Sequence, residues 1–316
     1  MYSLRFFEFR SGGNNKNDRI LKRKSGEKIN MSKTNRKPFI KWVGGKGRLL
    51  PELLESIKKL DGSFESYYEP FVGGGALFFE LSRLGIINGL KQHIQLSDAN
   101  QELINTYIIV RDYPNELLEK LSLFKKNHSK EFYYEIRAWD RDESFQERNL
   151  IDRAARFIYM NKTGFNGLYR VNKKNQNNVP MGRYKNPDIC NREVILSASQ
   201  SLKGVTIKHC GYLDAIQDSK QGDLIYLDPP YYTKDSNSKF TSYTKSQFLE
   251  KEHLELIQEI KVLDKAGVRL IQSNSYSEFI KEKYLKFNIN EVSTRRSISQ
   301  NSDSRGEVLE LLITNF

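Results

Sequence analysis

The chain has 316 residues, of which 38% are hydrophobic and 12% are aromatic, and a chain of this length and composition can bury a sizeable core. No run reaches the ~18 apolar residues of a membrane-spanning helix, and the amino-terminal residues lack the apolar core of a signal peptide, so we expect a cytoplasmic protein without a membrane partner. The two cysteines lack CxxC spacing and the four histidines are scattered, which argues against a disulfide framework and against a metal site.

The formal net charge of +12 would favour a nucleic-acid partner if it were spread over the chain, but it is not. Residues 1–46 hold 13 Lys and Arg against 3 Asp and Glu, a net charge of +10, which leaves +2 for the remaining 270 residues. The basic and polar composition of residues 1–36 is typical of a disordered extension, and Met31 is an alternative start of translation. The total charge alone therefore does not identify a partner.

Ordered sequence is expected from Lys37 onward. In "KPFIKWVGGKGRLLPELLESIKKL" a glycine-rich turn precedes leucines at helical spacing, which predicts a helix over about residues 49–57. The stretch "SYYEPFVGGGALFFELSRLGI" then predicts a strand, a glycine turn and a helix, and "KQHIQLSDAN" predicts a strand that ends at Asp98. This order is typical of the opening of a doubly wound α/β sheet.

From residue 101 to 190 the sequence predicts helices rich in aromatic and charged residues, followed by the turn-rich segment "FNGLYRVNKKNQNNVPMGRYKNP". Strand patterns return only with "VTIKHCGYLDAI", "DLIYLDPP" and "VRLIQSNS". We therefore predict an α/β fold, in which residues 37–100 and 191–316 form a Rossmann-like sheet domain and residues 101–190 form an inserted, mainly helical domain.

The glycine turn is the first candidate ligand site. Gly73 and Gly75 lie where a strand should turn into a helix, although Phe78 replaces the third glycine of GxGxxG, so a simple tight turn is an alternative. Asp98 favours a ligand, because an acid about 20 residues beyond such glycines can accept hydrogen bonds from a ribose diol. Nucleotides and S-adenosylmethionine (SAM) both carry that ribose.

The stretch "WVGGKG" lacks the GKS or GKT ending of a phosphate loop, which excludes nucleotide hydrolysis at this position. Trp42 and Lys46 remain candidates for covering a cofactor. The alternative for these two side chains is a core tryptophan and a surface lysine.

The second candidate site follows the apolar run "DLIYL", which predicts a strand buried on both faces with Asp228 at its carboxyl end. Pro229 and Pro230 have no N–H groups, so an aspartate oxygen and an adjacent carbonyl can together accept both hydrogens of an amino group. Tyr231 offers a face on which a planar base can stack. Such a set suits the exocyclic amine of a flipped nucleobase, whereas a simple strand-end turn would explain only the prolines.

The segment from Phe165 to Lys185 holds five basic residues and no acid, with aromatic residues between them. Its lysines can contact phosphates and an arginine can read guanine through two hydrogen bonds, while a solvated loop is the alternative.

Several of these motifs occur in one order: "KWVGGKGRLLP", "EPFVGGGALF", "LSDANQELI", "FNGLYRVNKKNQNNVPMGRYKNP", "YLDPPYY", "FTSY" and "RRSISQN". From about Lys37 to Asn315 the chain closely resembles the Dam-type DNA adenine-N6 methyltransferases of the D12 class, alpha group, which methylate adenine in GATC. The resemblance implies direct attack of a flipped adenine amine on the methyl group of SAM, without a metal and without a covalent enzyme intermediate. It implies double-stranded DNA containing GATC as partner, and an association with a restriction-modification system is a further hypothesis.

The resemblance also implies roles for individual residues. The residues that hold the target adenine are Asp228, Pro229, Pro230 and Tyr231. The cofactor-binding positions are Trp42, Lys46, Phe71, Gly73, Gly75, Asp98, Tyr212 and Asp228. The DNA-binding positions are Phe165, Asn166, Leu168, Arg170, Asn172, Lys173, Lys174, Pro180, Arg183, Tyr184, Arg295 and Arg296, with Arg170 at the guanine-reading position.

The chain departs from the family pattern at three places. The extension before Lys37 has no counterpart, Phe165 replaces a tyrosine of some relatives, and the loop "KKNQNN" is more polar than the usual glycine-containing version. Two other classes of function stay open at this point. A nicotinamide-dependent oxidoreductase would share the glycine turn and Asp98, and a non-catalytic DNA-binding module would share the basic segment.

Overall fold

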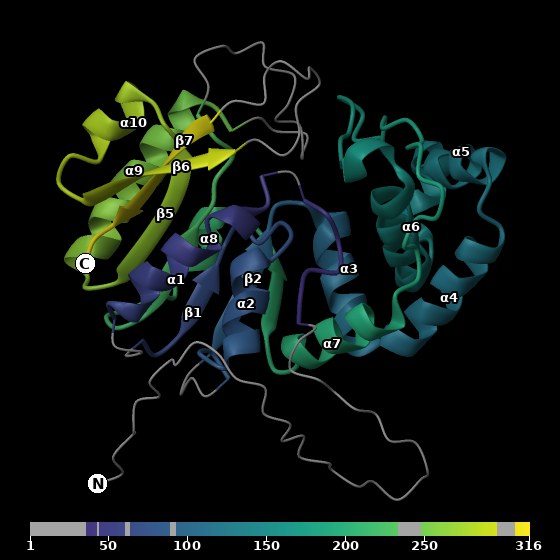
Figure 1. The fold of residues 1–316 in the computed structure, drawn as a ribbon, viewed down its shortest axis with the longest axis horizontal. Coiled ribbons are helices and arrows are strands. Elements are labelled where there is room, and N and C mark those ends of the chain that lie inside the picture. The colour runs from purple at the N-terminus through teal and green to yellow at the C-terminus, as the bar shows by residue number, and fades with distance from the viewer. Residues whose placement is uncertain (1–35, 43, 61–63, 89–92, 233–247, 296–306) are drawn as a thin grey trace, which may run out of the picture. The chain divides into compact units, whose positions relative to one another are not determined.

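The computed structural model describes residues 36–42, 44–60, 64–88, 93–232, 248–295 and 307–316, and residues 35–316 form one compact unit (Figure 1). The predicted disordered extension, apart from Arg36, and the alternative start at Met31 lie outside the described residues.

The described residues form a seven-stranded sheet with the order β3-β2-β1-β4-β5-β7-β6. Strands β1 to β5 run parallel, whereas β7 is antiparallel to both β5 and β6. The strands are β1 (Tyr67–Glu69), β2 (Ile94–Asp98), β3 (Thr206–His209), β4 (Leu224–Leu227), β5 (Arg269–Ser275), β6 (Asn288–Arg295) and β7 (Glu307–Thr314).

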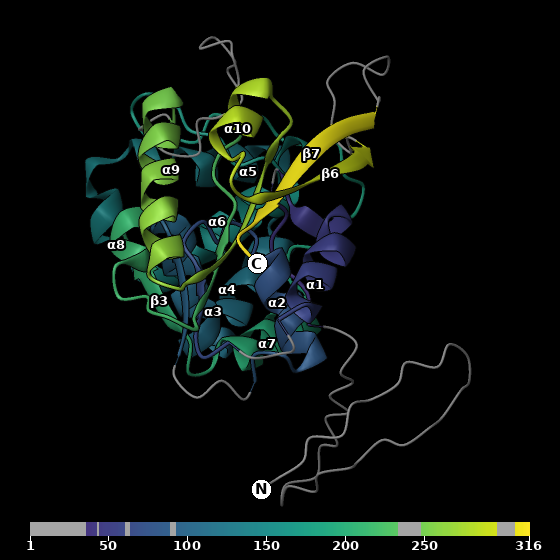
Figure 2. The same ribbon diagram turned by 90° about the vertical axis from the view of Figure 1, so that its left-hand side faces the viewer.

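Successive strand residues point to opposite faces, and each face packs on its own core. Tyr67 and Tyr226 belong to the core under one face, and Tyr68 and Ile225 belong to the core under the other. Helices α1 and α9 lie on opposite sides of the sheet (Figure 2). Outside the segment between β2 and β3, the α-helices of the described residues are α1 (Leu50–Lys58), α2 (Ala76–Leu84), α8 (Tyr212–Ile216), α9 (Glu250–Lys265) and α10 (Glu278–Lys283).

Between β2 and β3 the chain is mainly helical (Figure 1). The side chains of Asn100, Ser129, Asn149 and Asn191 each accept a hydrogen bond from a backbone N–H of the first turn of the helix that follows, which explains where these helices begin. Their buried side chains continue the core beneath the sheet. These helices are α3 (Gln101–Asp112), α4 (Pro114–Lys126), α5 (Lys130–Ala138), α6 (Leu150–Thr163) and α7 (Arg192–Leu202).

The strand order places a topological switch point at β1, which lies between β2 and β4. Ligands of doubly wound sheets bind at the carboxyl ends of the strands beside such a point. The predicted strand ending at Asp98 is confirmed, as is the predicted strand before Asp228, whose residues are all buried. The α/β, Rossmann-like fold class is therefore confirmed, and the acids named from the sequence lie at the edge where ligands bind.

Among the described residues, no helix is both long and apolar enough to cross a membrane.

Candidate functional site

The glycine turn after β1 has a backbone that requires glycine. Gly73 has φ +46° and Gly75 has φ +66°, both in the left-handed region. A Cβ atom on Gly73 would lie 2.7 Å from Trp42 Cδ1, and one on Gly75 would lie 2.7 Å from the Tyr107 hydroxyl oxygen. The Tyr107 hydroxyl donates to the Gly73 carbonyl at 3.0 Å. The turn is thus held from beneath by Tyr107 and covered by Trp42.

Asp98 ties the end of β2 to this turn. Its Oδ2 accepts from the Gly73 N–H at 3.1 Å, and its Oδ1 accepts from the Asn100 N–H at 2.9 Å. Burial raises the pKa of Asp98 to about 6, although these two N–H groups favour the charged form. Each carboxylate oxygen retains capacity for a further hydrogen bond, so Asp98 can still accept from a diol.

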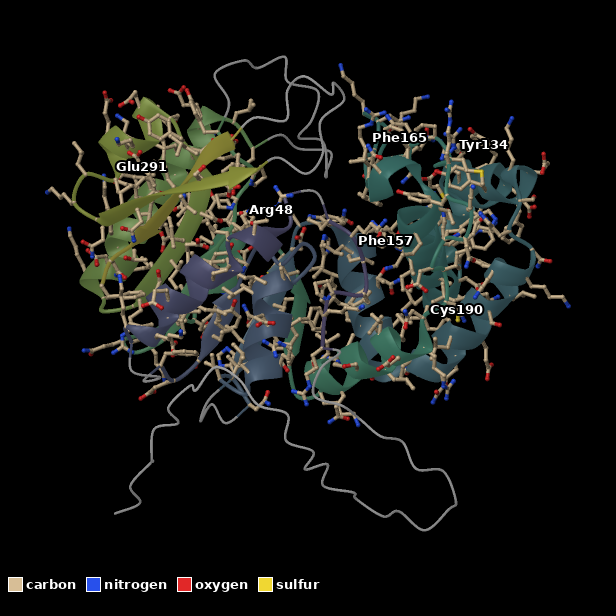
Figure 3. All side chains as sticks on the ribbon, in the orientation of Figure 1. Arg48, Tyr134, Phe157, Phe165, Cys190 and Glu291 are labelled. Atoms are coloured by element: carbon tan, nitrogen blue, oxygen red, sulfur yellow. The ribbon has the colours of Figure 1, made fainter. Side chains whose placement is uncertain are left out.

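Trp42 connects the glycine turn to the helical segment. Its ring stacks on Phe157 of α6, with ring centroids 6.2 Å apart, and on Tyr169, with centroids 5.9 Å apart. Figure 3 labels Phe157 on the side of the helical segment that is nearer the sheet. Trp42 is therefore packed between the turn and the segment that carries the candidate DNA-binding residues.

Phe71 and Tyr212, two predicted cofactor positions from different strand ends, are brought together. Their rings stack with centroids 5.4 Å apart and an interplanar angle of 24°. Phe248 packs edge-on against Phe71, and the Tyr212 hydroxyl donates to Glu255 of α9 at 2.9 Å. These rings form an apolar, planar surface suited to a purine.

Asp228 follows β4 and is held by two donors on one of its oxygens. Lys46 Nζ lies 2.7 Å from Oδ1, and the Ser273 hydroxyl of β5 donates to the same atom at 2.8 Å. The Tyr226 hydroxyl lies 3.1 Å from Ser273 Oγ and extends this chain of contacts. Among the described residues both side-chain donors reach Oδ1, so Oδ2 is left to accept from a ligand. Burial raises the pKa of Asp228, while Lys46 and Ser273 act in the opposite direction.

Lys46 also contacts the tyrosine that follows the prolines. Its side chain is only 6% exposed, and its Nζ donates to the Gly44 carbonyl at 2.7 Å and lies 4.5 Å from the centre of the Tyr231 ring. The Tyr231 hydroxyl donates to Glu310 of β7, and burial together with nearby carboxylates raises its pKa. Lys46 is therefore part of the Asp228 site, and the alternative of a surface lysine is wrong.

The backbone beyond Tyr231 is anchored on β5. The Tyr232 N–H donates to Asn274 Oδ1 at 3.2 Å, and the Ser275 hydroxyl donates to the Tyr232 carbonyl at 2.9 Å. The Tyr232 ring stacks on Phe279, with centroids 4.5 Å apart. These contacts fix the backbone at the end of the Pro229–Tyr231 stretch. They therefore limit how far the Tyr231 ring can move relative to the Asp228 carboxylate.

A second buried acid, Glu69, lies at the end of β1. It accepts from the Tyr67 hydroxyl at 2.8 Å, and burial raises the pKa of Glu69 to about 8, with the negative charge of Asp228 adding to the rise. Because the pKa of Glu69 is raised, Glu69 can remain neutral, which reduces the electrostatic repulsion between Glu69 and Asp228.

The candidate DNA-binding residues lie in a loop with irregular hairpin pairing. Isolated antiparallel bridges join Gly164 to Met181 and Val171 to Asn177. At the tip, Asn172 N donates to the Gln176 carbonyl at 2.9 Å. Figure 3 shows Phe165 at the upper end of the helical segment. The exposed members of the predicted set are Phe165, Asn166, Lys173, Lys174, Pro180 and Arg183, and the half-buried members are Leu168, Arg170, Asn172 and Tyr184.

Three parts of the prediction lie outside the described residues: Arg296, the side chain of Arg295 and the "FTSY" stretch. Among the described residues, no group of three His, Cys, Asp or Glu side chains lies close enough to hold a metal ion.

Sequence reasoning missed Ser273 and Glu310, which hold Asp228 and Tyr231. A signal for each was present in the sequence. Ser273 lies in "QSNS", a polar run that follows the apolar residues Leu270 and Ile271 of the same strand. Glu310 is a lone acid in the apolar run "VLELLIT". Polar residues in buried strands require partners and therefore often mark a site.

The chain is similar to known proteins over most of its length. A family model described as D12 class N6 adenine-specific DNA methyltransferase matches residues 42–298. The Type II methyltransferase M1.LlaDCHI of Lactococcus lactis subsp. cremoris is 40% identical over 290 residues, which cover 91% of this chain and 98% of that protein. The Type II methyltransferase M.MjaIII of Methanocaldococcus jannaschii is 38% identical over 292 residues, with coverage of 89% and 99%.

The DNA adenine methylase of Escherichia coli K12 is 31% identical over 277 residues, which cover 87% of this chain and 93% of that protein. These matches leave no support for an oxidoreductase or for a DNA-binding module without catalysis. The chain is an enzyme and belongs to the D12 class of N6 adenine-specific DNA methyltransferases.

Proposed function

We propose that the protein transfers a methyl group from SAM to N6 of adenine in double-stranded GATC, with the target base turned out of the duplex. The observation that carries this proposal is the Asp228 carboxylate, whose Oδ2 is left to accept a hydrogen bond. Pro229, the next residue, supplies a carbonyl as the second acceptor, and Tyr231 follows the two prolines. An exocyclic amine has two N–H groups, and these two acceptors match them. The match favours an adenine amine over a hydroxyl, which would offer only one hydrogen.

The protein prepares the amine for attack by holding its hydrogens. When the N–H groups point at Asp228 Oδ2 and at the Pro229 carbonyl, the nitrogen lone pair turns out of conjugation with the purine ring. Lys46 opposes the effect of burial on the pKa of Asp228 and so favours the charged carboxylate, which is the stronger acceptor. Tyr231 supports the base from one face.

SAM, when bound, would supply an electrophilic methyl group on a sulfonium. The residues present suit it: Asp98 can accept from the ribose hydroxyls, and the Phe71 and Tyr212 rings can contact the adenine. The glycine turn lets the backbone approach the ligand closely. We infer that residues 37–100 and 191–316 form the catalytic domain and that residues 101–190 form the target-recognition domain. The names of the two Type II relatives support an association with a restriction partner.

Asp98→Asn is expected to weaken SAM binding by about 1–3 kcal/mol, because hydrogen bonds to a charged group are lost. The wild-type affinity should fall as the pH falls through about 6, where Asp98 takes up its proton, and should level off above that pH. The variant should lack this dependence. Isothermal titration calorimetry from pH 5 to pH 8 measures both effects, and His209→Gln separates the influence of the nearby histidine. Equal affinities for wild type and Asp98→Asn would remove Asp98 from the cofactor site.

Arg170→Ala is expected to relax the preference of the protein for GATC over altered sites. An arginine that forms two hydrogen bonds to guanine contributes about 1–3 kcal/mol of discrimination, so methylation of GATC should fall far more than methylation of sites altered at guanine. Lys173→Ala and Lys174→Ala are matched controls, because exposed lysines on phosphates should weaken binding to all sequences and flatten its salt dependence. An equal loss on every duplex would make Arg170 a phosphate contact.

The overall proposal is tested by incubating unmethylated plasmid with the protein and SAM. Mass spectrometry of the nucleosides should detect N6-methyladenine, and an endonuclease blocked by methylation in GATC should no longer cut. Methyladenine in DNA that is still cut would retain the chemistry and reject GATC.

A further inference from the structure

We propose that Asn178 sets the guanine specificity of this protein by orienting the guanidinium of Arg170. This role presupposes the proposed reading of guanine by Arg170. Asn178 is a positioning residue here, since it acts through Arg170.

The two residues are joined twice across the recognition loop. Arg170 Nε donates to Asn178 Oδ1 at 2.8 Å, and the Asn178 N–H donates to the Arg170 carbonyl at 3.1 Å. The second bond aligns the two backbones, and the first fixes the plane of the guanidinium. Both side chains are half-buried, so neither bond is fully open to competition from water.

The bond through Nε decides which edge of Arg170 faces a ligand. A guanidinium has a planar set of five N–H donors, and it can present either the Nε edge or the end formed by Nη1 and Nη2. Asn178 occupies the Nε edge. Within the described part of the chain, neither Nη1 nor Nη2 has a hydrogen-bond or ion-pair partner. The end that remains is a two-pronged donor that matches O6 and N7 of guanine.

The backbone before Asn178 is fixed by a buried ion network. The Asn177 N–H donates to Asp140 Oδ2 at 2.7 Å, and Arg141 Nη2 donates to the Asn177 carbonyl at 2.5 Å. Arg156, from α6, lies 2.6 Å from the same Asp140 oxygen. Asp140 and Arg156 are 7% and 3% exposed, so this clamp lies in the interior rather than at the surface.

The backbone after Asn178 is fixed as well. The Val179 carbonyl accepts from the Tyr133 hydroxyl at 3.0 Å and from Arg137 Nη1 at 3.1 Å. Val179 is itself buried. Asn178 therefore lies between two anchored neighbours and keeps its position before DNA arrives. Because the two donors of Arg170 are already ordered, less conformational entropy is lost when DNA binds. The fixed geometry favours guanine over bases that offer a poorer acceptor pattern.

The test compares Asn178→Ala, Asn178→Asp, Arg170→Ala and the double variant Arg170→Ala/Asn178→Ala. For each, kcat/KM is measured on a GATC duplex and on the same duplex with the guanine pairs replaced by adenine pairs. The quotient of the two values is the discrimination ratio. Melting temperatures are recorded to confirm that each variant is folded.

Arg170→Ala should lower the discrimination ratio about 5- to 150-fold. Asn178→Ala should lower it about 3- to 10-fold, because one orienting hydrogen bond is lost. Asn178→Asp keeps an oxygen that accepts from Nε, so it should keep the ratio within about twofold of wild type, even if its negative charge weakens binding to every duplex. The double variant should match Arg170→Ala, because Asn178 acts only through that arginine.

A normal ratio for Asn178→Ala, together with a lowered ratio for Arg170→Ala, would overturn the role of Asn178 and leave guanine reading intact. Equal losses in Asn178→Ala and Asn178→Asp would overturn it too. A normal ratio for Arg170→Ala would reject both the role of Asn178 and the guanine reading on which it depends.

Discussion

Asp228→Ala is expected to abolish methyl transfer, lowering kcat/KM at least about a hundredfold, while the protein still binds duplex DNA. Asp228 is the acceptor that holds one amine hydrogen, and a positioned acceptor or base of this kind contributes on the order of 10²–10⁴ in rate. Transfer of a labelled methyl group from SAM measures the loss, and fluorescence anisotropy with a GATC duplex measures binding.

Asp218→Ala is the matched control, because the Asp218 side chain is 66% exposed and its ion-pair partner is Lys208, which the candidate site does not include. Circular dichroism shows whether Asp228→Ala is folded, since the substitution leaves the buried Lys46 without its ion-pair partner. Near-normal turnover in a folded Asp228→Ala protein would reject the proposed mechanism.

Lys46→Met is expected to lower turnover on the order of tenfold or more at pH 7, with partial recovery at higher pH. Burial raises the pKa of Asp228 and Lys46 lowers it, so removal of the ammonium raises the pKa further. The carboxylate must be charged to accept strongly, so the deficit should be largest at low pH. It should shrink as the pH rises through the new pKa of Asp228.

The measurement is kcat as a function of pH from 6 to 9.5 for wild type, Lys46→Met and Lys46→Arg. The arginine variant keeps the positive charge and should keep the acidic limb near its wild-type position. A deficit of Lys46→Met that is the same at every pH would mean that Lys46 does not act through the charge of Asp228.

The sequence predicts the strand ends that carry the site because the signals are local. The run "LIYL" is apolar throughout, which indicates a buried strand, and the acid and prolines that follow it mark its end. Asp98 is marked by a different local signal, a short strand that it ends and a glycine turn about 20 residues before it. Both acids reach one sheet edge because parallel strands in a doubly wound sheet place their carboxyl ends together.

The hydrogen bonds that hold the site and the recognition loop could not be predicted, because each joins residues from distant parts of the chain. Ser273 is 45 residues from Asp228, Glu310 is 79 residues from Tyr231, and Asp140 is 37 residues from Asn177. Each pairing depends on strand order or on the packing of a loop on a helix, which no local spacing encodes.

The place of β7 in the sheet has a consequence for protein synthesis. β7 follows β5 and β6 along the chain, yet it lies between them in the sheet and pairs with both. As a ribosome releases the chain, β6 emerges before the strand that joins it to the sheet. Glu310, which holds the Tyr231 hydroxyl, emerges on that same late strand. A nascent chain that has not released β7 therefore lacks both the strand that joins β6 to the sheet and the carboxylate that accepts from the Tyr231 hydroxyl.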